Sequence, residues 1–360
     1  MISAQGFSGS YDPADVTFLL TPIAMPTISL AEKEQLLRSG TVHYSHILST
    51  ELPPSDAYLT AYKVALKANA PRLASDIAAL ATAIARRPIV AEQGRRVVLA
   101  SLARAGTPIG VLIARKLRRL GVTAQHYSIS IIRDRGIDRA AIEFIRNRHP
   151  GVEILFVDGW TGKGAIAAEL RNSQCLADLG IPPYLVVVAD PAGQADLAAT
   201  ADDYVIPSGL LNGIVSGLVS RSVLTDEIGP GAFHGCRILS ELTPYDQSRE
   251  FLATIEQKMV TDFAYDPTNW NDVIRQARRA ACCRLLENIG KNFLVANRNS
   301  IKPGVAEATR AVLRRVPRML LLTDIADPQL SHLVMLANER NVPIVQVDEL
   351  FGYRAVALLP

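Results

Sequence analysis

The segment "EILFVDGWTGKGAIAAEL", residues 153–170, combines the pattern of a buried strand, a loop and the start of a helix. A largely apolar run, 153–157, is followed at once by Asp158 and then by the loop 159–164, which contains three glycines, a threonine and a lysine. Glycines allow successive backbone N–H groups to turn into one concavity, and such a nest next to a helix N-terminus binds phosphate well. The segment therefore predicts a phosphate-binding loop at the carboxyl end of a strand.

The side chains of this loop extend the prediction to a phosphorylated sugar. A threonine hydroxyl and a lysine ammonium can both donate to phosphate, and Asp158 can hold sugar hydroxyls or a magnesium ion that bridges them. The GxxxxGK[ST] pattern of a P-loop fails because Gly164 follows Lys163, and no GxGxxG fingerprint is present. The alternative is a tight turn whose glycines serve geometry alone. The predicted ligand-binding residues here are Asp158, Gly159, Thr161, Gly162, Lys163 and Gly164.

The surrounding sequence alternates between strand and helix patterns from residue 96 onward. Strands in such a cadence form a mainly parallel sheet covered by helices on both faces, and ligands bind at the carboxyl ends of the strands. The loops expected at that edge are "ARAGTP", "RDRG", "DGWTGKG" and "DPAG". In the first, Arg104, Gly106 and Thr107 form a second candidate anion site, and in the next, Arg133 and Arg135 can close over a ligand. The alternative for both loops is a set of exposed, solvated arginines.

We predict three parts of the chain: an N-terminal helical segment over 1–93, the α/β core and its extension over 94–283, and a small α/β sandwich domain over 284–360. Helix patterns cover 29–40, with Ser29 and Gly40 as caps, and 71–88, which is alanine-rich. The apolar stretch 208–224 is a further helix candidate, and 202–208 reads as a short strand.

Composition narrows the class of protein. The chain has 360 residues, of which 49% are hydrophobic and 20% charged, so global disorder is excluded, and a net charge of +3 is too small to indicate nucleic-acid binding. Four cysteines do not make a disulfide framework in a chain of this length. No signal peptide and no long uncharged apolar run is evident, so we expect a cytoplasmic protein with reduced thiols and no membrane association.

The order of strand, "ARAGTP" loop, charged loop and "VDGWTGKGA" loop resembles the type I phosphoribosyltransferases. Set against their phosphoribosyl-pyrophosphate motif, Asp158 takes one of the two acidic positions and Thr161, Gly162, Lys163 and Gly164 take the loop. The other acid is replaced, by Val157 in an ungapped match or by Gly159 if one residue is deleted. The "ARAGTP" loop is similar to the family's pyrophosphate loop.

Longer stretches resemble one branch of that family. "GSYDPADVTFLL", "HYSHILSTE", "SIIRDRGID" and "IPSGLLNGIVSGLVSR" are similar to the phosphoribosyltransferase-like proteins of bacterial tellurite-resistance and stress operons, which are also catalogued as cysteine protease StiP. The stretch beginning "IKPGVAEATR" resembles the Pelota-type RNA-binding domain of the L7Ae/L30e superfamily. That resemblance implies RNA contacts near Glu307, whereas the alternative is a domain for dimerisation or regulation. The RNA-binding residues that it suggests are Lys302, Gly304, Arg310, Arg314 and Arg315.

The resemblance implies transfer of phosphoribose from phosphoribosyl pyrophosphate to a nitrogenous acceptor, with magnesium as the expected cofactor. We expect Arg104 and Lys163, with Arg133 or Arg135, to stabilise the departing pyrophosphate. A homodimer is also compatible with the family.

Two alternatives remain open: a non-catalytic regulatory protein that binds nucleotide or RNA, and a cysteine protease that uses Cys236 or Cys175. A protease requires a thiolate paired with histidine, and His234 lies only two residues from Cys236. His43 and His46 in "HYSHIL" fit a pocket wall better than a metal site.

Overall fold

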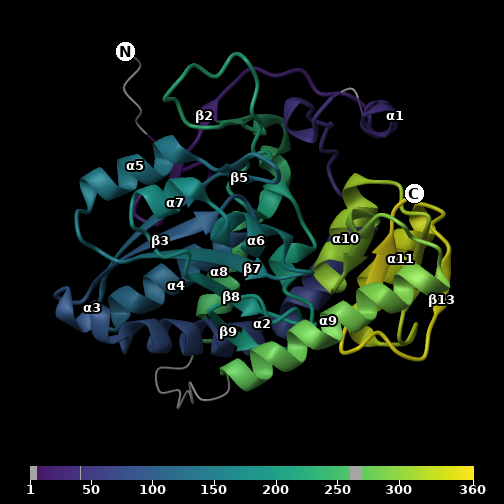
Figure 1. The fold of residues 1–360 in the computed structure, drawn as a ribbon. Coiled ribbons are helices and arrows are strands. Elements are labelled where there is room, and N and C mark those ends of the chain that lie inside the picture. Colours follow the sequence, from purple (N-terminus) through teal and green to yellow (C-terminus); the bar gives the residue numbers. More distant parts are fainter. Residues whose placement is uncertain (1–5, 41, 260–269) are drawn as a thin grey trace.

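The core of the protein is a six-stranded sheet in which every neighbouring pair is parallel (Figure 1). The computed structural model describes residues 6–40, 42–259 and 270–360. The strand order is β1 (Thr17–Leu19), β4 (Thr123–Ile129), β3 (Arg96–Leu102), β7 (Ile154–Trp160), β8 (Leu185–Ala189) and β9 (Leu197–Thr200). This confirms the predicted parallel α/β core.

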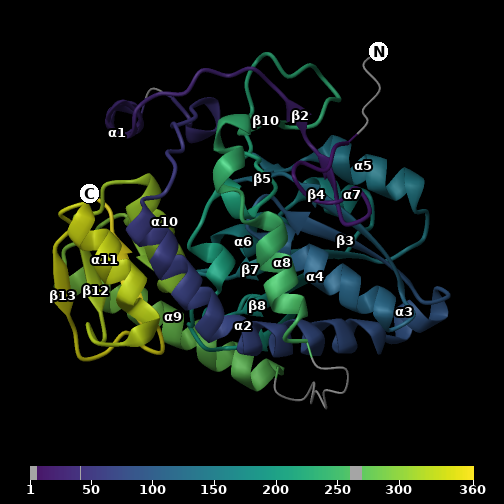
Figure 2. The same cartoon turned by 180° about the vertical axis from the view of Figure 1, so that it is seen from behind.

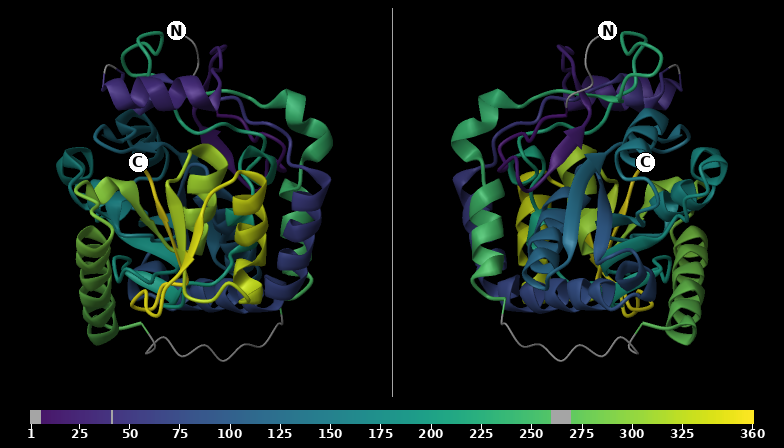
Figure 3. Two further views of the ribbon diagram at one scale, coloured as in Figure 1. Left: turned by 90° about the vertical axis from the view of Figure 1, so that its right-hand side faces the viewer. Right: turned by 90° about the vertical axis from the view of Figure 1, so that its left-hand side faces the viewer.

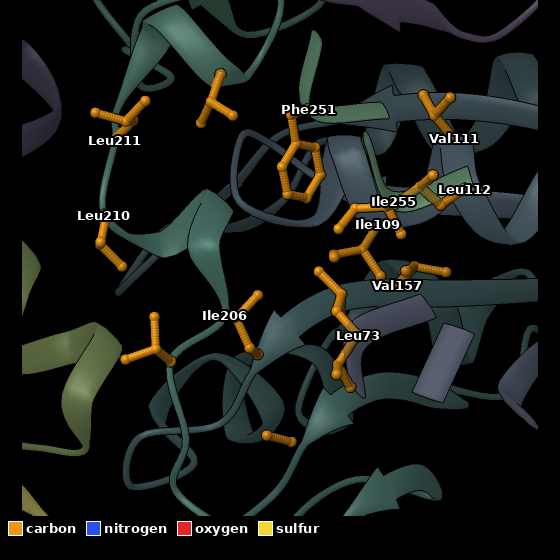
Figure 4. Packing of buried hydrophobic residues seen from close by; sticks show 14 of the residues in the cluster. Leu73, Ile109, Val111, Leu112, Val157, Ile206, Leu210, Leu211, Phe251 and Ile255 are labelled. Carbon is orange, nitrogen blue, oxygen red and sulfur yellow. The ribbon is translucent and has the colours of Figure 1, made fainter. Parts of the chain in front are cut away.

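Alternating side chains of the strands build two hydrophobic layers, because successive residues of a strand point to opposite faces. Val97 and Leu99 of β3 join one cluster, whereas Val98 and Ala100 join the other. In the first layer Leu73, Ile109, Val157 and Phe251 meet (Figure 4). The helices on that side are α2 (Asp56–Ala85), α4 (Gly106–Arg119) and α8 (Ser248–Glu256), and on the other side α5 (Arg139–Arg148), α6 (Ala165–Arg171) and α7 (Gln174–Asp178) (Figure 2).

The N-terminal segment is part of this core. Strand β1 pairs with β4 at the sheet edge, and α2 packs along α4. Helix α1 (Leu30–Ser39) has the predicted caps: the Ser29 side chain accepts from the Glu32 N–H, and Gly40 is left-handed. Helix α2 begins well before the predicted helix 71–88, because Ser55 caps it and the residues that follow present a buried stripe; Pro71 is accommodated inside it.

Two expected elements of the core are wrong. The stretch 208–224 is not an α-helix but carries two short turns, η2 (Pro207–Gly209) and η3 (Gly213–Val215). Gly217 and Leu218 both have positive φ, which a right-handed helix does not allow. The stretch 202–208 is not a strand, because β9 ends at Thr200 before it.

The C-terminal unit is a four-stranded sheet between helices (Figure 3). Its order is β11 (Ile301–Pro303), β14 (Ala355–Leu358), β12 (Met319–Leu322) and β13 (Ile344–Gln346), and only the β12–β13 pair is parallel. Helices α10 (Val305–Arg314) and α11 (Ser331–Glu339) cover one face and α9 (Asp272–Asn292) the other. Helix α9 begins before residue 284, where the sequence placed a boundary.

The C-terminal unit shares a continuous apolar core with the larger one, because α11 packs against α2. Within the described residues, no helix has both the length and the apolar character needed to cross a membrane.

Substitution of Ile77 in α2 by alanine should lower the free energy of unfolding by about 2–5 kcal/mol, since its fully buried side chain would leave a cavity. Val64→Ala in the same helix is the matched control: Val64 is 63% exposed, and its effect should stay within about 0.5 kcal/mol. Denaturant unfolding of both variants measures the difference. Equal effects would contradict the assignment of the buried face of α2.

Candidate functional site

A cavity of about 560 Å³ lies at the carboxyl edge of the parallel sheet, between the core and the C-terminal unit. Its walls come from the ends of β3 and β7, from the hairpin of β5 (Ile131–Ile132) and β6 (Gly136–Ile137), and from β11 and α10. Nine lysines and arginines line it, but only three carboxylates. The cations are Lys33, Arg104, Arg133, Lys163, Arg221, Lys302, Arg310, Arg314 and Arg315, and the acids are Asp134, Asp158 and Glu307.

Asp158 lies on the wall of this cavity, but β7 continues through Gly159 to Trp160, so the strand extends into the stretch predicted as a loop. Its Oδ1 accepts from the N–H of Gly159 at 2.8 Å. The pKa of Asp158 is raised to about 7, mainly by burial and also by Glu307, while the Gly159 N–H and Arg310 oppose the shift. The carboxyl is thus enclosed yet faces the cavity, and it exchanges its proton near neutral pH.

The side chains of the glycine-rich loop are already engaged. The Thr161 hydroxyl donates to Asp190, in the "DPAG" loop after β8. The Lys163 ammonium donates to two carbonyls of the C-terminal unit, those of Arg298 and Ile301. Both residues line the cavity as expected, but Lys163 links the two units, which the sequence did not indicate.

The glycines of this loop also serve the contact between the units. A Cβ at Gly162 would lie 2.6 Å from Cγ of Glu307. The Gly162 carbonyl accepts from the Tyr353 hydroxyl at 2.9 Å. Gly164 has φ of 84° and precedes α6. The glycine at 162 therefore allows close approach of α10, whereas the N–H groups of Gly159 and Thr161 are already bonded to Asp158 and to the Ala189 carbonyl.

The "ARAGTP" loop contributes Arg104 but not its other two candidates. Arg104 donates to the Val219 carbonyl at 2.7 Å and forms an ion pair with Glu51. The Thr107 hydroxyl is buried against Ser128 at 2.8 Å, and neither Gly106 nor Thr107 lines the cavity. The expected anion cradle therefore reduces to the arginine and the backbone before α4.

Of the two candidate arginines in the hairpin of β5 and β6, only one lines the cavity. Arg133 lines the cavity, and its backbone N–H donates to the Tyr44 hydroxyl at 2.6 Å. Arg135 is exposed and does not line the cavity, so it is not part of the site in this structure. His43 belongs to the pocket wall, as expected, and no cluster of potential metal ligands occurs in the described ranges.

The residues expected to contact RNA face inward. Arg310 places its guanidinium 4.6 Å from the centroid of the Trp160 ring, while Arg314 donates to Oδ1 of Asn212. Arg315 forms an ion pair with Glu34 of α1. Lys302 also lines the cavity, and Gly304 starts α10 next to Asp203. In this structure Lys302, Arg310, Arg314 and Arg315 line the cavity and are partly buried, so they do not form a fully exposed RNA-binding surface.

Burial and nearby positive charges lower the pKa values of two lysines of the cavity. Burial, with help from Arg221, lowers the pKa of Lys33 to about 7. Burial also lowers the pKa of Lys163 to about 7, and Lys302 adds to that shift. The Nε groups of Arg133 and Arg310 have no hydrogen-bond partner among the described residues. The excess of lysines and arginines makes the cavity positively charged, and an anion bound there would relieve the repulsion.

Three cavity residues were missed from the sequence. Lys33 lies on a helix with an ordinary polar pattern, and Arg221 lies inside the stretch 208–224 that was predicted as a helix, so neither gave a signal. Trp160 stands inside the quoted loop and could have been considered as a cation–π partner.

None of the described cysteines makes a hydrogen bond to a histidine. Cys236 is fully buried, and burial raises its pKa to about 12. His234 is bonded to Ser130 through Nδ1 at 2.8 Å. Burial also raises the pKa of Cys175. A reactive thiolate needs the opposite shift.

Comparison with known proteins identifies the family. Residues 9–256 match the family described as tellurite-like stress resistance cysteine protease StiP, and residues 280–360 match the PELOTA RNA binding domain. The chain belongs to the StiP family. A relative named cysteine protease StiP, from Acinetobacter baylyi, is 40% identical over 371 residues, which cover 100% of this chain and 96% of the relative. The family recognised from the sequence motifs is thereby confirmed.

Solved phosphoribosyltransferases show a distant structural similarity. The hypoxanthine phosphoribosyltransferase of Trypanosoma cruzi is 16% identical, with a TM-score of 0.29 over 37% of this chain and 80% of that protein. An HGPRT-ase from Leishmania tarentolae in complex with GMP is 15% identical, with a TM-score of 0.28 over 36% of this chain and 75% of that one. These scores are too low to bear on the chemistry of the site.

Ribose 5-phosphate should bind less tightly as the pH rises above 7. The phosphate monoester is already dianionic there, since its second pKa is about 6. Lys33 and Lys163, with pKa values of about 7, lose their protons over this range, and Asp158 becomes negative, so all three changes weaken anion binding. Each required proton reduces the affinity by at most about tenfold per pH unit.

Isothermal titration of ribose 5-phosphate at several pH values measures this dependence. Lys33→Met should flatten it, whereas Lys291→Met, an exposed position on α9, should leave it unchanged. An affinity that is constant or rises with pH would refute the electrostatic description of the cavity.

Proposed function

We propose that the protein is a phosphoribosyltransferase-like enzyme whose donor, phosphoribosyl pyrophosphate, binds in the cation-lined cavity. The excess of nine cations over three carboxylates, at the carboxyl edge of a parallel sheet, carries this proposal. A donor with phosphates at both ends would neutralise cations on two walls at once. Asp158 lies between those walls, where it can accept hydrogen bonds from the ribose hydroxyls.

In the proposed reaction, the bond between the ribose anomeric carbon and the pyrophosphate oxygen breaks, and its electron pair leaves with pyrophosphate. A bond from the acceptor nitrogen to the same carbon forms, and the nitrogen releases one proton to water. The transition state is oxocarbenium-like, so positive groups fixed near the leaving oxygens assist departure. Arg133 and Arg310 are the chain's candidates for that role, since Lys163 is held by carbonyls and Arg104 by Glu51.

Magnesium fits this site as an ion that arrives with the donor. Mg²⁺ is commonly bound through one or two carboxylates together with substrate phosphates, and Asp158 and Glu307 are carboxylates on the cavity wall. Asp158 would hold the ion; when bound, magnesium would offset charge on the pyrophosphate. A single carboxylate near the end of β7 suits a metal ion that the ligand phosphates also coordinate. It suits less well a metal ion that the protein binds alone.

The C-terminal unit would then complete the donor site, rather than bind RNA independently. Its Lys302, Arg310 and Arg314 line the cavity, and the Lys163 tether closes the unit over the loop. The regulatory alternative, a non-catalytic sensor of nucleotide or RNA, uses the same cavity. Release of pyrophosphate only when an acceptor is added would distinguish the enzyme from the sensor.

Binding of phosphoribosyl pyrophosphate should weaken by about tenfold or more in Arg310→Met, because a charged hydrogen bond is worth about 1.5–3 kcal/mol. Arg135→Met, which removes an exposed arginine outside the cavity, is the matched control and should bind normally. Calorimetric titration measures both. Asp158→Asn should lose the gain in affinity that magnesium gives the unaltered protein. Absence of binding by the unaltered protein would defeat the proposal.

The protease named for the family is less well supported by this geometry. Cys236 and Cys175 lack a histidine partner among the described residues, and burial raises the pKa of both thiols. We expect iodoacetamide to spare Cys236 in the folded protein at neutral pH, while the exposed Cys283 reacts. Mass spectrometry of the alkylated protein tests this, with urea-unfolded protein as the control. Rapid modification of native Cys236, together with peptide cleavage that Cys236→Ser abolishes, would favour the protease.

A further inference from the structure

A second chamber of about 520 Å³ adjoins the donor cavity and is not used by the proposed donor. Four residues line both spaces and form the partition between them: Lys33, Arg104, Arg221 and Arg314. The volume falls in the range of small-molecule sites, about 300–1,000 Å³. The two spaces thus meet at a boundary made of positive side chains.

Away from this boundary the chamber is largely apolar. Its walls come from α10 and α11, from the stretch that was wrongly predicted as a helix, and from the segment before α2. Leu52 is 77% exposed although it lines the chamber, and it marks the side open to solvent. The apolar lining residues are Leu30, Leu48, Leu52, Pro53, Pro54, Leu210, Leu211, Ile214, Leu242, Leu313 and Leu336.

The carboxylate at the boundary is fully occupied. Glu51 accepts from the Arg104 guanidinium and from the Gly213 N–H at 3.1 Å. Burial alone would raise the pKa of Glu51, but the Arg104 charge holds it below its ordinary value. Glu51 therefore remains ionised and balances Arg104, and it leaves the other boundary cations without a bonded acid.

Those other cations make hydrogen bonds to neutral groups only. Arg314 donates to Oδ1 of Asn212 at 2.7 Å. Arg221 donates to the Tyr44 and Ser222 carbonyls. Lys33 donates to the Ser49 hydroxyl and the Arg314 carbonyl, each at 3.4 Å. A positive inner end and an apolar body are complementary to a small acid with an apolar body.

We propose that this chamber binds the acceptor, a small nitrogen-containing acid with an apolar body whose carboxylate contacts Arg314 and Lys33. The acceptor role rests on the proposed function, because a ligand of this chamber is an acceptor only if a phosphoribosyl donor binds in the adjoining cavity. The binding site itself stands on the chamber's own shape and charge. The acid would be positioned with its polar end at the boundary, beside the donor.

Indole-3-carboxylate and its neutral counterpart indole-3-carboxamide are suitable probes of this chemistry. The acid should bind about tenfold or more tightly than the amide, as expected for a charge-assisted contact. Leu313→Trp, which fills the chamber, should abolish binding of the acid and leave pyrophosphate binding intact. Leu52→Trp, at the exposed mouth, is a second blocking variant that does not disturb the core. Titration calorimetry measures each affinity, and thermal melting checks that both variants fold.

Three results would overturn the proposal: equal binding of acid and amide, unchanged binding of the acid in both tryptophan variants, or direct displacement of the acid by pyrophosphate. The last result would place the acid in the donor cavity. Failure of the donor assignment looks different, because the acid would then bind in the chamber while neither pyrophosphate nor phosphoribosyl pyrophosphate bound to the protein.

Discussion

The repulsion between positive side chains that are enclosed together is the constraint on which the site depends. Buried charge is costly unless it is paired, and removing a partner from such a pair destabilises a protein strongly. Here the core and the C-terminal unit each bring cations to one cavity, but pair few of them with acids. Burial, reinforced by the neighbouring cations, lowers the pKa values of Lys33 and Lys163. An anion bound in the cavity would supply counter-charge and so would stabilise the closed arrangement.

Close approach of the two units makes this arrangement possible. The two units are joined in two places. Helices α2 and α11 share a continuous apolar core, and hydrogen bonds connect the glycine-rich loop to the C-terminal unit. The contact at the glycine-rich loop depends on Gly162, since a Cβ there would collide with the side chain of Glu307. A glycine that the sequence offered for phosphate binding thus has a packing role as well.

Local patterns predicted those features that depend on neighbouring residues in the chain. The apolar strand that carries Asp158, the loops at the carboxyl edge and helix α1 follow from periodicity, glycine placement and the Ser29 and Gly40 caps. The stretch 208–224 misled because its apolar residues have helical spacing, while the left-handed Leu218 is imposed by packing around it. Helix propensity is a weak prior that tertiary contacts override.

Contacts between distant segments decided the parts that the sequence did not reveal. Arg104 was expected to face a phosphate, yet Glu51 pairs with it from a segment far away in the chain. Arg310 and Arg314 were assigned to RNA because the C-terminal unit was considered alone. Charge on a helix predicts that a partner exists but not which one, and docking of the units turns these arginines toward Trp160 and Asn212.

The positions of Arg310 and Arg314 affect which ligands can reach a site that is built from two units. A nucleic-acid-binding face and a phosphosugar site need the same chemistry, which is fixed cations arranged for phosphate. When the two faces are apposed, each cation serves the shared cavity, and the surface available to a long polyanion is lost. An RNA could reach Arg310 only if the units separated, which would break the Lys163 and Tyr353 hydrogen bonds and expose the apolar contact of α11 with α2. A small ligand would contact both walls without that cost.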